Sequence, residues 1–512
     1  MRGEEVLEIG FILTIITYIR TRIVSNITVT NMITPSHCDL AFMSAKYHFD
    51  DELANVLRAL FNVDQASLRL LRMMMPNTKL ETLKRSLLIL VKYQLVDYTK
   101  AVDKSFNQQY EYSVAPSRVF SFFRVQKFVQ KVESKHGTIQ GILVKALVGR
   151  GVLNRDELLT VVGHDMINHK LENSIEITRD LTTNHLDSLI SRRIVVSSGS
   201  NLCVNIEKLS RLYRDELVTE TVYSLFNRNS KVRSIAETIL ELSRDNTPDD
   251  ASQSTPVTML DLYSSLVPDI FPTPVQLERY MTRLVEETGI RIFETSGIHP
   301  QKGPMFSINV GSIIDHLMKE HVSARITTRF GPQCCRIFKV LLKRGPLLLK
   351  QVEEMVMLPA RDVREYSYML IKEGLIRNRQ VPKTPDNAPG KSVFIMSVEL
   401  DQVVYNIADL CCRSISNLLR RVLHESDKDK TLLEQAIEAQ RIIDSEESKL
   451  GLKHEHKSDL WGQYFNSHEL VQLETIRFKL DKMLLAKCQV DDTLFLAHTW
   501  LCLRPSLVKS ID

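Results

Sequence analysis

The sequence lacks the short signatures of the common enzyme classes. It contains no GxxxxGK[ST] phosphate loop, no GxGxxG that opens a helix after a strand, no HExxH and no GxSxG. It also lacks a CxxC pair among its 8 cysteines. Cys334–Cys335 and Cys411–Cys412 are neighbours in sequence, a spacing that suits neither a zinc site nor an ordinary disulfide. These absences favour a protein with reduced cysteines that is not an enzyme and holds no cofactor and no metal.

The chain also lacks an N-terminal hydrophobic run that could cross a bilayer. The apolar stretch Ile9–Tyr18 is only ten residues long, whereas a spanning helix needs about 20. Glu4 and Glu5 stand where a secretory signal would carry positive charge. We therefore interpret residues 1–40 as an extension outside the main fold. The 512 residues, 44% hydrophobic and 25% charged, are typical of a globular protein with several domains.

One stretch, residues 329–398, has the pattern of a winged helix. Apolar residues recur at helical spacing over Val363–Ile371, which predicts a helix with one buried face that ends at Gly374. A strand is expected to begin at Leu375, and the β-rich segment Val393–Val398 is its expected hairpin partner. Short helices followed by a hairpin with a long, polar tip are typical of the winged helix, a variant of the helix-turn-helix.

The same pattern occurs three more times. A helical apolar stripe leads into a strand at Val96, Val195 and Ile292, as it does at Ile376. These positions are 99, 97 and 84 residues apart, which exceeds the roughly 20–50 residues of solenoid repeats, so each unit should be a small domain. We predict a mainly α fold with small β-hairpins, in which four winged helices occupy residues 41–116, 117–214, 215–325 and 326–400. The polar segment 244–256 is expected to be a mobile loop within the third.

Beyond residue 401 the pattern indicates helices alone. Leu473, Ile476, Leu480 and Met483 follow the alternating spacing of three and four residues that forms the seam of a coiled coil. We predict a helical hairpin or coiled coil over residues 401–500, with a tail over 501–512, and these four residues as candidates for contact with a partner protein. Two helices that lie on the core of the fourth winged helix explain the pattern nearly as well.

Charge is distributed unevenly along the chain. Residues 326–400 hold 13 Lys and Arg against 7 Asp and Glu, and residues 116–155 hold 8 against 1, whereas residues 425–474 hold 6 against 12. Basic winged helices with an acidic arm suggest nucleic acid at one end and protein at the other. The candidates for DNA contact are the cations on the third helix and wing of the fourth unit: Arg361, Arg364, Arg377, Arg379, Lys383 and Lys391. A role in contacting protein or in stabilising the wing fits them equally well.

The chain resembles one family in three segments of residues 329–398: RFGPQCCRIFKVLL, KQVEEMVMLPA and the wing tip VPKTPDNAP. This family is the RNA polymerase III subunit that consists of four tandem extended winged helices and a C-terminal coiled coil, and it is related to the larger chain of transcription factor IIE. Weaker similarity runs through KYHFDDELANVL, LKRSLLILVKYQLVDY and QVDDTLFLAHTW, so the resemblance covers roughly residues 40 to 500. Residues 1–40 match nothing in the family pattern, and its long charged insertion around the second unit is nearly absent here.

This resemblance implies a non-catalytic subunit in the nucleus. It implies as partners the two other members of a heterotrimer specific to RNA polymerase III, the clamp of the largest subunit, initiation factors and DNA. It implies no cofactor, no membrane and no small-molecule substrate. The heterotrimer would assist promoter opening and initiation at genes for transfer RNA, 5S RNA and other short transcripts.

Two other functions stay open. A scaffold subunit of a proteasome-lid or translation-initiation complex would carry a single winged helix near its C-terminus, whereas four hairpins are predicted here. A winged-helix regulator that reads sequence would need a third helix rich in Asn, Gln and Arg. The helix over Val363–Lys372 has Arg364 but is otherwise mostly apolar or acidic.

Overall fold

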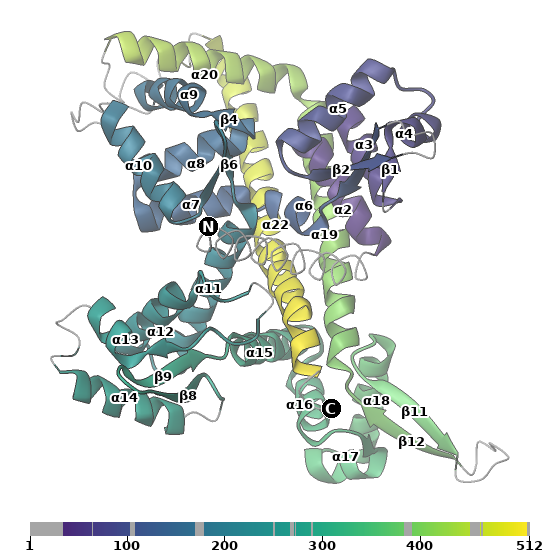
Figure 1. Cartoon of the computed structure of the whole chain (residues 1–512). Helices are drawn as coiled ribbons and strands as arrows, with labels where there is room; N and C mark the ends of the chain where they lie inside the picture. The colour runs from purple at the N-terminus through teal and green to yellow at the C-terminus, as the bar shows by residue number, and fades with distance from the viewer. Residues whose placement is uncertain are drawn as a thin grey trace. The chain divides into compact units, whose positions relative to one another are not determined.

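The computed structural model describes residues 34–63, 65–102, 108–168, 179–248, 251–266, 271, 273–287, 290–382, 392–450, 461 and 464–508 (Figure 1). The chain divides into two compact units, residues 1–213 with 412–491 and residues 214–411 with 492–512. No helix of the described segments is both long enough and apolar enough to cross a membrane. The fold combines many helices with four small antiparallel sheets, which confirms the predicted mainly α fold with small β-hairpins.

The first unit contains two winged-helix modules with the same order of elements. Module 1 comprises α2 (Pro35–His48), α3 (Asp51–Phe61), β1 (Ala66–Ser67), α4 (Leu68–Met74), α5 (Leu80–Lys92), β2 (Val96–Val102) and β3 (Gln108–Val114). Module 2 comprises α6 (Pro116–Phe122), α7 (Val125–His136), α8 (Thr138–Arg150), β4 (Leu153–Asn154), α9 (Arg155–Asn168), α10 (Arg179–Ser191), β5 (Val195–Ser198) and β6 (Asn201–Val204). Helix α11 (Ile206–Leu225) follows module 2.

The second unit contains two further modules with this order. Module 3 comprises α12 (Ser230–Ser243), β7 (Val257–Thr258), α13 (Met259–Ser265), α14 (Pro274–Glu287), β8 (Phe293–His299) and β9 (Gly303–Ile308). Helix α15 (Val310–Phe330) leads into module 4, which comprises α16 (Pro332–Arg344), β10 (Leu347–Leu348), α17 (Leu349–Val356), α18 (Ala360–Lys372), β11 (Arg377–Pro382) and β12 (Ser392–Ser397).

Each sheet has three strands, and the last strand of the module lies in the middle. The orders are β1-β3-β2, β4-β6-β5, β7-β9-β8 and β10-β12-β11, all antiparallel. The outer partner on one side is a strand of two residues, such as Leu347–Leu348, which pairs with Met396 and Ile395. The helices supply the core beneath each sheet; in module 2, for example, Phe128, Leu143 and Leu186 are fully buried in one cluster. This is the winged-helix topology, four times over.

Three long helices follow the modules: α19 (Leu400–Lys428), α20 (Lys430–Leu450) and α22 (Ser467–Val508). The first unit holds a small apolar cluster in which Ala436 and Ala439 of α20 pack with Phe465 and with Leu473 of α22. A pair of packed helices is therefore present, as predicted, but a third helix, α19, precedes it. Helix α22 also continues past the predicted limit at residue 500, because Trp500 and Leu503 are buried and the Trp500 Nε1 donates to Asp315 Oδ1 at 3.0 Å.

Two other boundaries differ from the sequence-based expectation. Helix α2 begins at Pro35, inside the expected extension 1–40, because Pro35 suits a first turn and Leu40 is buried; residues 1–33 lie outside the described residues. The segment 244–256 is expected from its sequence to be a mobile loop, but its second half, residues 251–256, is held in place. There Ser254 is buried, its backbone N–H donates to Ile308 O at 2.9 Å, and its hydroxyl accepts from the Ile308 N–H, so the segment is bound to β9.

A buried charge cluster attaches α7 to α22 within the first unit. Arg124, 4% exposed, donates from Nε to Asp491 Oδ1 at 2.8 Å. Lys127 donates from Nζ to the backbone oxygen of Cys488 at 2.8 Å and lies 3.4 Å from Asp491 Oδ2. Burial lowers the pKa of the neighbouring Lys487, whose ammonium lies 5.6 Å from the ring centre of Tyr47. Asp491 is thus the carboxylate that balances a crowded set of cations.

We expect Asp491→Ala to lower the free energy of unfolding of the first unit by about 3 kcal/mol, because it leaves the buried Arg124 without its carboxylate. Urea unfolding of the full chain, followed by circular dichroism, measures the change as a lower midpoint. Asp481→Ala, at an exposed position of α22, is the matched control and should change stability by less than about 0.5 kcal/mol. Equal midpoints for the two variants would contradict the assigned role of Asp491.

Candidate nucleic-acid interface

The third helix of module 4, α18, presents a mixed polar face to solvent. Pro359 precedes its first residue, and Gly374, with φ of +70°, follows its end. Val363, Ser367 and Leu370 are buried and fix which face points inward. Arg361, Arg364 and Tyr368 are exposed, at positions i, i+3 and i+7. Residues with this spacing share one side of a helix.

The wing of module 4 is the hairpin of β11 and β12, drawn beside α18 in Figure 1. Its register pairs Arg377 with Ser397 and Arg379 with Ile395. Arg377 and Arg379 are two residues apart on one strand, so both side chains project from the same face. Both are mostly exposed, 62% and 63% respectively.

These two arginines bind the same carboxylate. Arg377 Nη1 donates to Glu399 Oε2 at 2.5 Å, and Arg379 Nη2 donates to Glu399 Oε1. Hydrogen bonds from both guanidinium groups lower the pKa of Glu399 from its ordinary value. Two cations and one anion at the root of the wing leave a local net charge of +1, which reduces the attraction of this site for phosphate. The sequence did not point to Glu399, because it lies beyond the hairpin, 20 residues from Arg379.

The other predicted DNA contacts are placed less closely together. Arg364, 67% exposed, has its Nε 3.6 Å from Glu353 Oε1 of α17. Arg361 is exposed at the start of α18, and no ion pair joins it to another of the described residues. Lys383 and Lys391 lie outside the described residues. Of the six candidates, the structure therefore brings Arg377 and Arg379 together and places Arg361 and Arg364 on the neighbouring α18.

Exposed aromatic side chains on the same module were missed by the sequence reasoning. Tyr368 on α18 is 69% exposed and Phe394 on β12 is 46% exposed. The available signal was the position of Tyr368, on the same helical face as Arg361 and Arg364. Phe394 pairs with Gln380 and so projects from the face of the hairpin opposite to Arg377 and Arg379, whereas Tyr368 lies with Arg361 and Arg364 on one side of α18. Exposed aromatics beside arginines, as on α18, are typical of surfaces that contact a phosphate backbone and stack on bases. The arrangement can therefore bind nucleic acid without reading its sequence.

Two arginines of the basic run over residues 116–155 are buried inside the first unit. Arg118 is only 5% exposed: its Nη1 donates to Gln94 O at 2.8 Å, and it also binds Asp97. Arg124 is equally buried, against Asp491. These two side chains are bound within the first unit, which removes them from the surface that could meet DNA.

The predicted partner contacts of α22 fall on its inner side. Leu473 and Ile476 are buried, 3% and 6% exposed, while Leu480 and Met483 are half-buried. A second apolar set on the same helix is exposed instead: Val471, Phe478 and Leu485 are 64%, 68% and 61% exposed. The intervals of seven residues place these three side chains in one stripe. The seam predicted from the sequence is thus the internal face, and the missed stripe is the face exposed to solvent.

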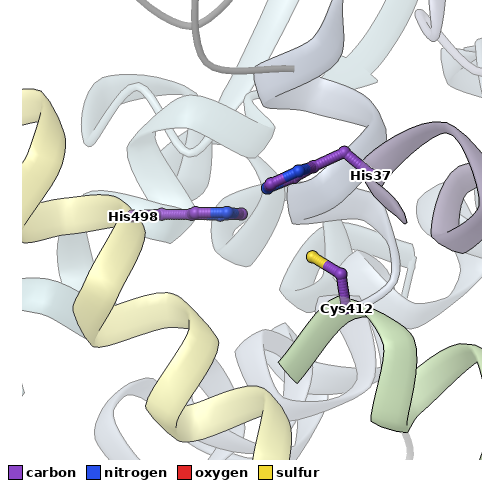
Figure 2. A group of neighbouring side chains, drawn as sticks. All are labelled: His37, Cys412 and His498. Carbon is purple, nitrogen blue, oxygen red and sulfur yellow. The ribbon is translucent and has the colours of Figure 1, made fainter. Parts of the chain in front are cut away.

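Figure 2 shows the side chains of His37, Cys412 and His498, carried by α2, α19 and α22. His498 belongs to the second unit and the other two residues to the first, so only His37 and Cys412 are considered together. His37 Nδ1 is hydrogen-bonded to Thr34 Oγ1 at 2.7 Å, and its ring meets Phe120 edge-on at 5.6 Å between centroids. A histidine that caps its own helix and a single cysteine are too few ligands for zinc, and we assign no metal to them.

Comparison with known proteins finds a matching domain family and several similar proteins. The family described as "POLR3C, C-terminal winged-helix domain" matches residues 322–398, the end of α15 and module 4. The chain is 28% identical to the DNA-directed RNA polymerase III subunit RPC3 of Mus musculus over 298 residues, 58% of this chain and 55% of that protein. Identity to the Homo sapiens protein is 26% over 297 residues, 58% of this chain and 54% of that one.

A more distant relative, the subunit rpc3 of Dictyostelium discoideum, is 26% identical over 129 residues, 25% of this chain and 19% of that protein. The chain spans about half the length of the mammalian relatives that it matches. These matches confirm the resemblance inferred from the segments of residues 329–398.

We expect replacement of both Arg377 and Arg379 by glutamine to raise the pKa of Glu399 toward the ordinary carboxyl value, because its two hydrogen-bond donors are lost. In the unchanged chain, the contact is present at neutral pH and is lost as pH falls through the lowered pKa. A carboxyl-detected NMR titration of the chain measures both values. Arg361→Gln is the control that should leave Glu399 unchanged, and an unshifted titration in the double variant would show that the two arginines do not bind this carboxylate in solution.

Proposed function

We propose that this chain, a relative of subunit RPC3 of RNA polymerase III, acts as a non-catalytic subunit of RNA polymerase III in the nucleus. The observation that carries the proposal is the match of module 4 to the C-terminal winged-helix domain of that family. The similarity to the mammalian subunits over 58% of the chain supports it further. The four three-stranded sheets, which share one strand order, fit a chain built from four winged helices, as expected for this family.

We further propose that the chain assists promoter opening as part of a heterotrimer on the clamp of the polymerase. Module 4 supports a contact with DNA, since α18 and the wing expose Arg361, Arg364, Arg377 and Arg379. Cations of this kind bind phosphate without regard to sequence, as an accessory subunit at many different genes requires. Lys383 and Lys391, which lie outside the described residues, stay candidates for the same contact from their place in the sequence.

The partners proposed for the chain are the two other subunits of the heterotrimer, the clamp and the initiation factors. The exposed stripe of Val471, Phe478 and Leu485 supports a contact with another protein, since three large apolar side chains in a row on one helix face are unusual on a free surface. Leu480 and Met483, which are half-buried, lie on the face of α22 opposite to this stripe, so they are not part of the same proposed contact.

The two alternative functions fit the fold less well. A scaffold subunit with a single winged helix would have one three-stranded sheet, whereas four occur among the described residues. A regulator that reads base edges would expose Asn, Gln or Arg along its third helix. The exposed face of α18 carries Arg361 and Arg364 but also Glu365 and Tyr368, which favours a contact with the backbone of DNA.

We expect Glu399→Gln to bind duplex DNA several-fold more tightly than the unchanged chain and with a steeper dependence on salt, because it releases Arg377 and Arg379 for phosphate. Fluorescence anisotropy of a labelled duplex over a series of salt concentrations measures both quantities. Glu354→Gln, which removes an exposed carboxylate from α17, is the matched control for net charge. If the two variants bound equally, the wing root would have no special part in DNA binding.

The proposed role in promoter opening is tested by transcription of a transfer RNA gene in a nuclear extract depleted of this chain. We expect depletion to abolish synthesis and the added full-length chain to restore it. A variant with Arg361, Arg377 and Arg379 changed to glutamate should restore little synthesis from a closed duplex, but nearly normal synthesis from a template already melted at the start site.

Equal failure of this variant on both templates would show that these residues act in assembly, not in opening. Undiminished synthesis after complete depletion would contradict the proposed function as a whole.

A further inference from the structure

Module 4 has a groove on α16, the first helix of the module. Its volume is about 550 Å³, and residues of α15, α16 and α17 line it. Four of the lining side chains are cations, Arg336, Lys339, Lys343 and Arg344, and all four are exposed. The groove does not include any of the residues assigned to DNA on α18 and the wing.

The cations of the groove are largely free to meet an anion. Lys339 lies 3.5 Å from Glu320 of α15, in a pair that is about half exposed and therefore weak. Among the described residues, no ion pair involves Arg336, Lys343 or Arg344. Arg336 and Lys343 are seven residues apart on one helical face, a distance of roughly 10 Å along the axis. The positive charge is thus spread along the groove and not held at one point.

The cations surround an apolar lining. Val340 lies between Arg336 and Lys343 on the same face of α16, and Met355 of α17, 43% exposed, contributes to the lining. Pro332 adds to it at the N-terminal end of α16. A phosphate backbone needs cations but makes little use of apolar surface. An amphipathic peptide uses both, because its apolar side chains are removed from water while its carboxylates meet the rim.

We propose that this groove binds an acidic, amphipathic segment of a partner protein. The apolar side chains of the segment cover Val340 and Met355, and its carboxylates pair with Arg336 and Lys343. In a segment of polyproline II conformation, carboxylates three residues apart lie on one side about 9 Å from each other, which matches the roughly 10 Å between these cations. This site goes beyond the proposed function, because it is formed mainly by α16, which precedes α18 and the wing in the sequence. Its occupation does not depend on DNA.

The test is fluorescence anisotropy of the full chain with a labelled synthetic peptide that carries glutamate at every third position, with leucine and phenylalanine at the positions between. We expect saturable binding, and we expect Arg336→Glu together with Lys343→Glu to weaken it about tenfold or more, as reversed charges oppose the peptide. Val340→Ser together with Met355→Ser should weaken it severalfold through loss of apolar contact. Lys350→Glu, an exposed cation of α17 outside the groove, is the control and should leave binding within about twofold.

A second peptide, with serine in place of leucine and phenylalanine, keeps the charge and separates the two sources of affinity. We expect it to bind at least about tenfold more weakly than the first peptide. Equal binding of the two peptides would overturn the proposal. It would also be overturned if duplex DNA displaced the first peptide from the unchanged chain and if the Arg336 and Lys343 changes removed this binding of DNA, because the groove would then be a phosphate site. Failure of the first peptide to bind would overturn it as well.

Discussion

Each module depends on the pairing of a strand of only two residues with the returning strand of its wing. Leu347–Leu348 pairs with β12 in module 4, and Ala66–Ser67 pairs with β3 in module 1. The short strand joins the first helices of a module to its hairpin, so the apolar faces of three helices are covered by one sheet. A domain of this size buries only a small hydrophobic core, and the sheet covers the side of that core that the helices leave open. Everything beyond the sheet, the exposed face of the third helix and the projecting hairpin, is then available for contacts.

Charged side chains serve the packing of the first unit but lie at the surface of module 4. Arg118 and Arg124 lie within a basic run, yet each is bound to a carboxylate inside the first unit and serves its packing. In module 4 the balance is different, because Arg377 and Arg379 share Glu399 at an exposed position. A shared carboxylate of this kind orients the two guanidinium groups and still leaves one positive charge. Such a balance would suit the contact with DNA that we propose, since a contact made during promoter opening would also have to be released.

The third helices and wings could be predicted from the sequence because their signals are local. Leu83, Leu87 and Leu90 have helical spacing and are buried in α5, and the hairpin of module 4 lies where its β-rich segments predicted it. The strands of two residues could not be found, since two residues have no periodicity. In module 3 the strand signal at Ile292 did not show how far the hairpin extends: β8 runs to His299, with an irregularity between Thr295 and Ile298.

Glu399 and the exposed stripe of α22 could not be predicted for the same reason. Glu399 meets Arg379 only after the wing has folded back, and the two faces of α22 differ only in what packs against them. Leu473 is covered by α20 while Phe478 is not. Both residues are apolar and both have heptad partners, so spacing alone could not choose the face that stays open. Burial of charge and choice of face are tertiary properties, and they required the structure.

A chain that acts as a subunit of RNA polymerase III, as we propose, must be found bound to the other subunits in the cell. The most direct measurement is an affinity purification of the tagged chain from its own cells, with the co-purifying proteins identified and quantified by mass spectrometry. We expect the large subunits of RNA polymerase III to be recovered with the chain in near-equal amounts. Recovery of a proteasome-lid or translation-initiation assembly, or of no stable partner, would contradict it and would leave the four winged helices without the function proposed for them.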